Sequence, residues 1–309
     1  MDRLVADIGG THARFALAGP DGQPHDEQKL LAADFPGPLE AARAYLAGRK
    51  VRDAVLAVAT PVYSDWIDLT NSPWAFSVAE LRQQLGLERI AAINDFTAQA
   101  LAVPRLAPED RILIKPGQPR QGCAIAVIGP GTGLGVAGLL PVQGTWYPIP
   151  SEGGHVSFAP HDDRDAAVLA RLRARFGHVS NERVLSGPGL INLATTLAEL
   201  DGEELALDDP REVSRRAQTG ESRHCREALE RFSSLLGAAA GDLGLLYCAL
   251  GGVYIGGGLC KRLGSLLDVE RLRKSFVAKG RLSYYLELIP IYLVTRRDPG
   301  LLGAAVYPL

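Results

Sequence analysis

Two short segments of this sequence share one plan: an apolar strand, a turn of glycine and threonine, and a second apolar strand. The first covers residues 5–18 around Gly9-Gly10-Thr11, and the second covers residues 124–140 around Gly131-Thr132-Gly133. Such turns need glycine for their backbone angles, and the missing Cβ lets their N–H groups approach phosphate oxygens. The pair predicts two similar lobes that each present a glycine turn to one cleft.

Hydrophobic patterns in the first third of the chain alternate between strands and helices. We expect strands at residues 3–8, 13–18, 54–59 and 90–94, and helices at residues 39–46, 78–85 and 96–101. Ser77 and Glu80 have the spacing of a capping box, which predicts the start of the second helix. This alternation predicts an α/β domain with a mixed or parallel sheet.

Four prolines within residues 103–121 indicate a domain boundary. Farther on, an apolar stripe from Leu229 to Leu250 predicts a central buried helix, and a strand at residues 253–255 leads into a third glycine turn. We expect two domains, a small α/β domain over residues 1–105, completed by residues 296–309 with a closing helix, and a large α+β domain over residues 106–295.

Composition and charge exclude several classes of protein. The 309 residues suffice for two domains, and a net charge of −2 without a Lys/Arg-rich run argues against a nucleic-acid partner. Four cysteines without a CxxC pair favour a reduced cytoplasmic protein over one with two disulfides. The chain opens on a strand pattern rather than a signal peptide, and its long uncharged stretches hold too many glycines and prolines for membrane helices. We therefore expect a soluble protein with no membrane partner.

The three glycine turns indicate phosphate binding without a P-loop. None of them contains lysine, and the second does not open a dinucleotide-binding βαβ unit. Phosphates would then be held by backbone dipoles, threonine hydroxyls and a metal ion. Asp7 ends the strand before the first turn, where it would either cap the turn or anchor the outer shell of a nucleotide-bound Mg²⁺ ion.

Acidic and amide side chains beside strands and glycine loops point to recognition of a polyol. Asn94-Asp95 follows an apolar strand, where it would lie at the mouth of a cleft or merely cap the next helix. Glu152 and His155 share a loop with two glycines, and Glu182 precedes another glycine loop. Carboxylates, amides and imidazoles can each pair with sugar hydroxyls. We expect Glu152, His155 and Glu182 to be buried polar groups that need such partners.

In this order the motifs resemble those of the bacterial glucokinases. The motifs that carry the resemblance are Asp7-Ile8-Gly9-Gly10-Thr11-His12-Ala13-Arg14, Ile93-Asn94-Asp95-Phe96-Thr97-Ala98, Gly131-Thr132-Gly133-Leu134-Gly135, Glu152-Gly153-Gly154-His155, Glu182-Arg183-Val184-Leu185-Ser186-Gly187 and Gly256-Gly257-Gly258. The resemblance runs from about residue 3 to residue 304. It implies a two-domain, actin-like (ribonuclease H-like) sugar kinase fold with a cleft between the small α/β domain and the larger α+β domain. It also implies that ATP with Mg²⁺ phosphorylates glucose at its 6-hydroxyl.

The same resemblance implies roles for individual residues. Asp95 would be the catalytic base and would contact the sugar together with Asn94, Glu152, His155 and Glu182. The phosphate loops would be Gly9-Gly10-Thr11 and Gly131-Thr132-Gly133, with Gly256-Gly257-Gly258 beside the adenosine. A homodimer is the assembly implied by the family. Three positions depart from the usual pattern: His12 replaces a frequent Asn, Pro130 stiffens the second turn, and Ser151 replaces a common Gly.

Other functions remain open at this point. A kinase for mannose or N-acetylglucosamine would need the same motifs. A non-enzymatic sugar sensor or repressor would need a helix-turn-helix segment, for which a first strand at residue 3 leaves no room. An actin-like filament protein would keep the nucleotide loops but not the clustered sugar acids. The Cys-rich zinc motif of the related repressor/kinase (ROK) family is absent, which argues against that branch.

Overall fold

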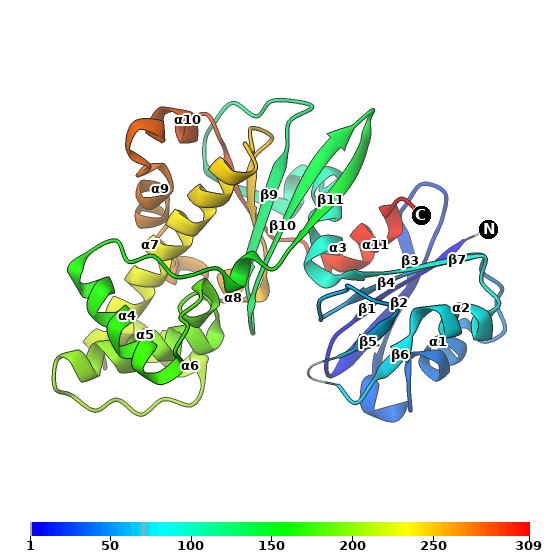
Figure 1. Ribbon diagram of the computed structural model, residues 1–309, viewed down its shortest axis with the longest axis horizontal. Coiled ribbons are helices and arrows are strands. Elements are labelled where there is room, and N and C mark those ends of the chain that lie inside the picture. Colours follow the sequence, from blue (N-terminus) through cyan, green and yellow to red (C-terminus); the bar gives the residue numbers. More distant parts are fainter. Residues whose placement is uncertain (1, 70–71) are drawn as a thin grey trace. The chain divides into compact units, whose positions relative to one another are not determined.

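Two large sheets organise the computed structural model, which describes residues 2–69 and 72–309 (Figure 1). Each sheet belongs mainly to one of two units. Unit 1 comprises Met1–Ala107, Thr145–Pro150 and Arg296–Leu309, and unit 2 comprises Pro108–Gly144 and Ser151–Thr295. Each unit has a hydrophobic core of its own.

The elements of unit 1 alternate between strands and helices, as expected from the sequence. In chain order they are β1 (Arg3–Ile8), β2 (His12–Ala18), β3 (Pro24–Leu31), η1 (Ala32–Asp34), α1 (Pro38–Leu46), β4 (Asp53–Val58), β5 (Trp66–Asp68), β6 (Ala75–Ser77), α2 (Val78–Leu85), β7 (Arg89–Asn94), α3 (Asp95–Ala102), η2 (Val103–Arg105) and, near the chain end, α11 (Pro299–Val306). The strand order β3-β2-β1-β4-β7 gives a mixed sheet, in which β1, β4 and β7 are parallel and β2 and β3 antiparallel. This confirms the predicted mixed sheet.

Helices cover both faces of this sheet because both faces are apolar. On one face, Leu4 and Phe15 belong to a core that includes Tyr45 of α1 and Leu81 of α2. On the other face, α11 packs against α3, β1 and β4. A Cβ on Gly303 of α11 would lie only 1.6 Å from the carbonyl oxygen of Ala98, so the small residue lets α11 approach α3 closely. The closing helix is thus part of the layer that holds α3 in place.

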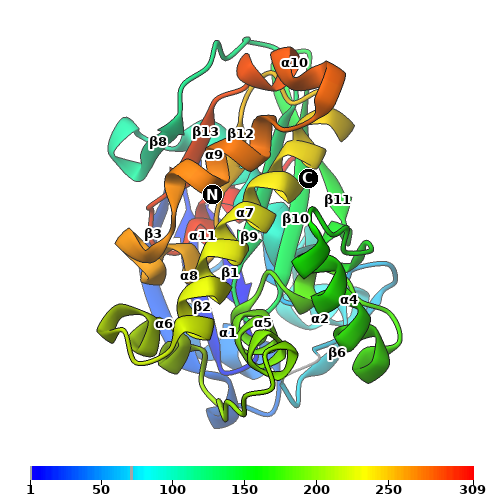
Figure 2. The same cartoon turned by 90° about the vertical axis from the view of Figure 1, so that its left-hand side faces the viewer.

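The elements of unit 2 begin with a short turn and strand and then become mainly helical. In chain order they are η3 (Pro108–Asp110), β8 (Arg111–Lys115), β9 (Ile125–Pro130), β10 (Leu134–Val142), β11 (Thr145–Ser151, mostly within unit 1), η4 (Gly153–His155), α4 (Asp163–Phe176), η5 (Asn181–Arg183), α5 (Gly187–Leu200), α6 (Pro210–Thr219), α7 (Arg223–Leu246), β12 (Val253–Ile255), α8 (Gly258–Leu263), η6 (Gly264–Leu266), α9 (Val269–Val277), η7 (Gly280–Leu282), α10 (Ser283–Glu287) and β13 (Ile291–Val294). Helices α7 and α9 lie side by side, and α5 and α6 also pack on α7 (Figure 2).

The second sheet repeats the plan of the first. Its order is β11-β10-β9-β12-β13-β8, with β9, β12 and β13 parallel and β10 antiparallel to β9. Read from β11 to β13, this matches the order and the known directions of β3-β2-β1-β4-β7. The two strand–turn–strand units seen in the sequence therefore occupy equivalent places in the two sheets.

The central helix of unit 2 ends four residues earlier than the apolar stripe predicts. Helix α7 begins after Ser222, whose side chain accepts a hydrogen bond from the Cys225 N–H, and it ends at Leu246 rather than Leu250. Cys248 adopts a positive φ of 46°, which breaks the helix, and Leu246 is left 76% exposed. The stripe continues past the helix because the following residues return to the core in a turn.

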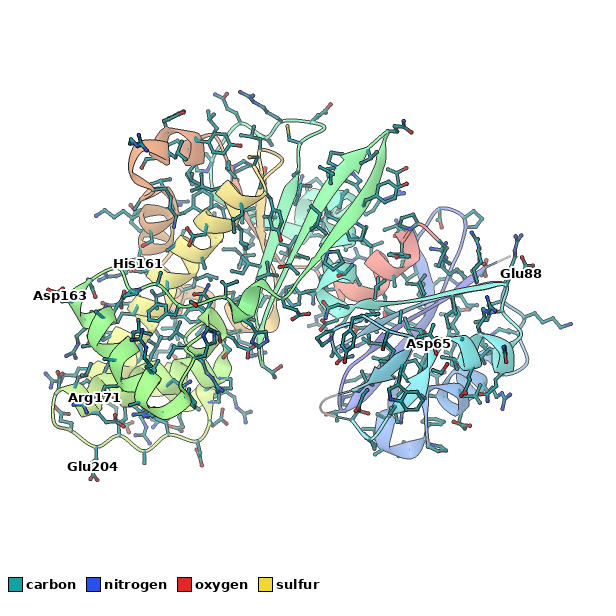
Figure 3. All side chains as sticks on the ribbon, in the orientation of Figure 1. Asp65, Glu88, His161, Asp163, Arg171 and Glu204 are labelled. Carbon is teal, nitrogen blue, oxygen red and sulfur yellow. The ribbon has the colours of Figure 1, made fainter. Side chains whose placement is uncertain are left out.

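The predicted capping box at α2 is formed only in part. The Ser77 hydroxyl accepts a hydrogen bond from the Glu80 N–H at 3.1 Å, as expected. Asp65, which is labelled in Figure 3, adds a contact of its own at this helix start: its carboxylate accepts from the Ala79 N–H at 2.8 Å and from the Ser77 hydroxyl. Ser77 is the last residue of β6, where it pairs with Trp66 of β5.

Two further observations concern the whole described chain. Within residues 2–69 and 72–309, no helix combines the length and the apolar character needed to cross a membrane. The cysteines Cys123, Cys225, Cys248 and Cys260 are free thiols, and burial raises the pKa of Cys260 to about 12.

Candidate active site

In unit 1, the predicted site residues gather at the carboxyl edge of the parallel strands. Ile8 of β1, Val58 of β4 and Asn94 of β7 are in register across the sheet. The turn after β1 lies at this edge and is closed by a hydrogen bond of 3.0 Å from the Gly9 N–H to the His12 carbonyl. The fold therefore brings Asp7, the first glycine turn and Asn94-Asp95 to the edge where open α/β sheets bind ligands.

Asp7 faces Arg14, the residue directly opposite it on β2. The Arg14 Nη1 atom lies 3.6 Å from Asp7 Oδ2, and its Nη2 atom lies 3.1 Å from the Oδ1 atom of Asp298, just before α11. Burial raises the pKa of Asp7 to about 6, although the positive charge of Arg14 acts in the opposite direction. The sequence argument gave Arg14 and Asp298 no role. Cross-strand register could have indicated Arg14, whereas Asp298 is too distant in sequence for any local pattern to reveal it.

Asn94 and Asp95 stand at the junction of β7 and α3. The Asn94 side-chain oxygen accepts hydrogen bonds from the N–H groups of Phe96 (2.8 Å) and Thr97 (3.4 Å), and its amide donates to the Thr60 carbonyl at 3.3 Å. Asn94 is thus a helix cap, one of the two roles that its position allows. Asp95 is the first residue of α3, and its Oδ1 atom accepts from the Phe96 N–H at 2.8 Å. This bond fixes the carboxylate at the beginning of the helix, and a sugar contact of Asn94 stays a prediction.

In unit 2, the second and third glycine turns lie side by side. The Gly256 N–H donates to the Ile128 carbonyl at 2.8 Å, next to the end of β9. A Cβ on Gly257 would lie 2.3 Å from the Pro130 carbonyl oxygen, and Gly257 has a φ of 77°. Both turns therefore end at the same edge of β9 and β12, with their backbones in close contact.

Backbone angles do not explain the glycines of the first two turns, contrary to our expectation. Gly9, Gly131 and Gly133 are not at positive φ. At Gly133 a Cβ would lie 2.5 Å from Glu182 Oε2, so a larger residue would displace that carboxylate. At Gly131 a Cβ would meet nothing closer than 4.0 Å. The neighbouring side chain, rather than the backbone, explains Gly133.

The predicted sugar-binding side chains of unit 2 come from two adjacent loops. The loop of η4 carries Glu152 and His155, and η5 carries Glu182. The Asn181 N–H donates to the Val156 carbonyl at 2.9 Å, which ties the loops together. Glu152 and His155 are exposed and Glu182 is half-buried, so the expectation that all three are buried is wrong.

Local hydrogen bonds fix the shape of the η4 loop. The Ser151 hydroxyl accepts from the Gly153 N–H at 3.0 Å, so the residue that replaces a common family glycine holds the turn. The His155 carbonyl lies 3.1 Å from the Nε2 atom of His178. Ser151 was noted in the sequence only as a departure from the family pattern, and His178 was not singled out.

A pocket lies beside the second and third glycine turns. Its volume is about 390 Å³, and its walls come from the start of α6 and from α8. The lining residues are Asp209, Pro210, Arg211, Ser214, Leu259, Arg262 and Leu263. A Cβ on Gly187 would lie 3.2 Å from Pro210 and 3.4 Å from the Gly131 carbonyl, so the pocket adjoins the second turn as well. None of these lining residues carried a recognisable sequence signal.

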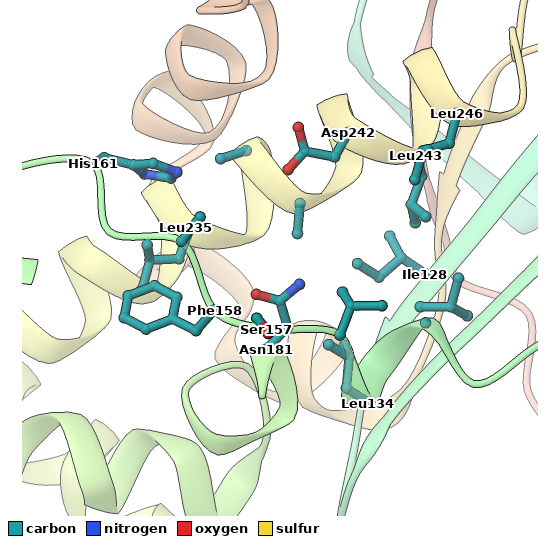
Figure 4. A pocket seen from close by; sticks show the side chains of 16 residues that line it. Ile128, Leu134, Ser157, Phe158, His161, Asn181, Leu235, Asp242, Leu243 and Leu246 are labelled. Carbon is teal, nitrogen blue, oxygen red and sulfur yellow. The ribbon is translucent and has the colours of Figure 1, made fainter. Parts of the chain in front are cut away.

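A second cavity adjoins the η4 and η5 loops, and most of its lining residues are apolar. Its volume is about 90 Å³, and Figure 4 shows Leu134, Phe158 and Leu243 among its walls, with the carboxamide of Asn181 at one side. Four polar side chains also line it, those of Ser157, His161, Asn181 and Asp242.

The described residues offer a metal ion only a limited set of ligands. Residues 2–69 and 72–309 contain no group of three or more His, Cys, Asp and Glu side chains able to hold an ion. Asp7 is a single carboxylate whose raised pKa indicates an incompletely compensated negative charge. This fits an outer-shell contact to an ion that arrives with a nucleotide, and it does not fit a protein-only metal site.

Each unit thus assembles its own part of the predicted site. Unit 1 holds Asp7, Gly9-Gly10-Thr11, Asn94 and Asp95 at one sheet edge. Unit 2 brings together the remaining predicted residues, which are Gly131-Thr132-Gly133, Glu152, His155, Glu182 and Gly256-Gly257-Gly258. A common site formed by the two groups stays a prediction.

Comparison with known proteins gives one consistent result. A family model described as Glucokinase matches residues 4–309. The glucokinase of Paramagnetospirillum magneticum is 46% identical over 307 residues, which cover 98% of this chain and 96% of that protein. The glucokinase of Chromobacterium violaceum is 46% identical over 308 residues, which cover 99% of this chain and 88% of that protein. A crystal structure of glucokinase from an Antarctic psychrotroph has a TM-score of 0.90 at 41% identity and covers 99% of this chain and 98% of its own. The fold is that of the actin-like sugar kinases.

Proposed function

Because this chain belongs to the glucokinase family, we propose that it transfers the γ-phosphoryl group of ATP to the 6-hydroxyl of glucose. The observation that carries the proposal is the family match over residues 4–309, which contains every residue given a role. The positions of these residues at the ends of strands and on adjacent loops support it.

Asp95 is the general base in this proposal. Its carboxylate accepts the proton of the 6-hydroxyl while the hydroxyl oxygen forms a bond to the γ-phosphorus. The bond between that phosphorus and the β,γ-bridging oxygen breaks, and ADP leaves with the electron pair. In such a transfer the protein mainly positions the reactants and stabilises charge. The hydrogen bond from the Phe96 N–H to Asp95 Oδ1 holds the base in place for this step.

The sugar takes its ligands from both units. Asn94 and Asp95 come from unit 1, and Glu152, His155 and Glu182 come from unit 2. Since the Asn94 oxygen caps α3 and one amide N–H donates to the Thr60 carbonyl, the second amide N–H is the group available to a sugar hydroxyl. The exposed positions of Glu152 and His155 leave their polar atoms accessible to hydroxyls.

The nucleotide is bound by the glycine turns. Gly9-Gly10-Thr11 and Gly131-Thr132-Gly133 contact the phosphates through backbone N–H groups and the threonine hydroxyls, and Gly256-Gly257-Gly258 lies next to the pocket for the adenosine. A Mg²⁺ ion bound with ATP would supply positive charge to the phosphates, and Asp7 would hold that ion as an outer-shell residue. We place the activity in the cytoplasm, where ATP is available, and a homodimer is the assembly that the family resemblance implies.

A panel of hexoses tests the proposal against its nearest alternative, a kinase for mannose or N-acetylglucosamine. ADP release is measured in a coupled assay with each sugar and without sugar, for the wild type and for Asp95→Asn. We expect the highest kcat/KM with glucose, at least about tenfold above the other two, because hydroxyls that are inverted or substituted leave polar groups unpaired. A higher kcat/KM with mannose or N-acetylglucosamine would assign the enzyme to that sugar instead.

A further inference from the structure

The segment from Glu182 to Gly187 touches the second phosphate turn at both of its ends. At one end, the Leu134 N–H donates to the Oε2 atom of Glu182 at 2.9 Å. At the other, the Gly187 N–H donates to the Gly131 carbonyl at 2.9 Å. Within the turn, the Gly131 N–H donates to the Gly133 carbonyl at 2.8 Å. The turn is thus held between two points of one segment.

Internal hydrogen bonds and burial hold the segment from Glu182 to Gly187 together, so we expect it to move as one piece. The Ser186 hydroxyl donates to the Glu182 carbonyl at 2.8 Å and accepts from the Gly189 N–H at 3.0 Å. Val184 and Leu185 are fully buried in the core of unit 2. A displacement of Glu182 is therefore passed on to the start of α5 and to the turn that both ends of the segment hold.

The carboxylate of Glu182 has a second oxygen available. Oε2 accepts from Leu134, whereas Oε1 accepts no hydrogen bond from the described part of the chain. An ionised carboxylate can accept at both oxygens at once. Glu182 can therefore bind a sugar hydroxyl without releasing the phosphate turn.

We propose that Glu182 is a positioning residue that couples sugar binding to the phosphate turn, with Oε1 on a sugar hydroxyl and Oε2 on the Leu134 N–H. The inference rests on the proposed function, which makes Glu182 a sugar ligand and residues 131–133 a phosphate loop. A sugar hydroxyl on Oε1 restrains the carboxylate, and the carboxylate restrains the turn. By linkage, each ligand then strengthens the binding of the other by the same factor.

Two glycines of the same turn provide a matched pair of variants. In Gly133→Ala the new Cβ would lie 2.5 Å from Glu182 Oε2, so the flexible carboxylate must move away. In Gly131→Ala the nearest atom is 4.0 Å away, and the carboxylate stays where it is. Neither glycine is at positive φ, so alanine strains neither backbone. We therefore expect Gly133→Ala to weaken sugar binding and Gly131→Ala to leave the sugar affinity nearly unchanged.

The first measurement is glucose affinity by isothermal titration calorimetry without nucleotide. We expect Gly133→Ala to weaken glucose binding about tenfold and Gly131→Ala to leave it within about twofold of wild type. Thermal unfolding of both variants checks that they are folded. Equal glucose affinity in Gly133→Ala and wild type would overturn the proposal, and so would an equal loss in both variants.

The second measurement repeats the titration with saturating ADP and Mg²⁺. In the wild type we expect the nucleotide to tighten glucose binding about fivefold or more, and in Gly133→Ala we expect this factor to fall close to one. Glu182→Gln keeps an oxygen for the Leu134 N–H, so it should retain more of the factor than Glu182→Ala. An unchanged factor in Gly133→Ala and Glu182→Ala would contradict the coupling. A wild-type protein that binds no glucose at all would instead contradict the proposed function.

Discussion

The guanidinium group of Arg14 lies 3.6 Å from the carboxylate of Asp7, which it faces across the first hairpin of unit 1. Even so, burial raises the pKa of Asp7 to about 6. One cation is therefore not enough to offset the loss of water around this carboxylate. A second cation near the Asp7 carboxylate, such as a nucleotide-bound metal ion, would stabilise its ionised form.

The raised pKa of Asp7 predicts a specific dependence of stability on pH. In the unfolded chain Asp7 loses its proton near pH 4, whereas in the folded protein it keeps the proton up to about pH 6. The folded state binds more protons between these values, so its stability falls as the pH rises from about 4 to about 6. We expect Asp7→Asn to be more stable than wild type at pH 7.5, by roughly 2 kcal/mol, and to lose this advantage near pH 4.

Urea unfolding at both pH values measures this difference. Asp34→Asn, which changes an exposed carboxylate of the same unit, serves as the matched control and should show no such pH-dependent gain. If Asp7→Asn were less stable than wild type at pH 7.5, the ionised carboxylate would contribute to folding, and its burial would not be costly.

Replacing the base should separate chemistry from binding. In Asp95→Asn the side-chain oxygen can still accept from the Phe96 N–H, so the start of α3 keeps its geometry. The proton acceptor is lost, which lowers kcat by about 10²–10⁴-fold, while the glucose affinity stays within about tenfold. Steady-state kinetics and calorimetry with glucose provide the two numbers. A variant that keeps more than about a tenth of the wild-type kcat would show that Asp95 is not the base.

Alanine substitutions of Glu152 and His155 should weaken glucose binding and leave nucleotide binding unchanged. Each side chain is exposed and makes few contacts of its own, so the fold should tolerate its loss. We expect each variant to lose about 1–3 kcal/mol of glucose binding, the value of a hydrogen bond that involves a charged or buried partner. Glu204→Ala, which removes an exposed acid on the α5–α6 loop of the same unit, is the control (Figure 3). Equal weakening of ATP and glucose would point to a folding defect instead.

Much of the fold of unit 1 could be predicted because its strands are apolar and its helices are amphipathic. The predicted strand at residues 3–8 and the closing helix predicted within residues 296–309 correspond to β1 and α11. Strand β3 was missed because its residues are mostly exposed and polar, which leaves no alternating pattern at this sheet edge. Local periodicity reports burial, so an exposed edge strand gives little signal.

The site was predicted as a set of residues, but its internal contacts were not. Strand ends and glycine turns mark Asp7 and Asp95 in the sequence, since both features are local. The bond between Leu134 and Glu182 joins residues 48 positions apart, and no spacing rule reveals it. The ion pair between Arg14 and Asp298 joins residues that lie still farther apart in the sequence. The sequence analysis attributed Gly133 to backbone angles. The structure shows instead that this residue packs against the carboxylate of Glu182, a tertiary contact.

The most direct test of the account is to identify the product of the reaction by ³¹P nuclear magnetic resonance. The wild-type protein is incubated with ATP, Mg²⁺ and glucose, and in parallel without glucose. The account predicts one glucose 6-phosphate for each ADP, little ADP without glucose, and almost no product with Asp95→Asn. ADP and inorganic phosphate formed equally with and without glucose would contradict it, as would phosphorylation of a different hydroxyl.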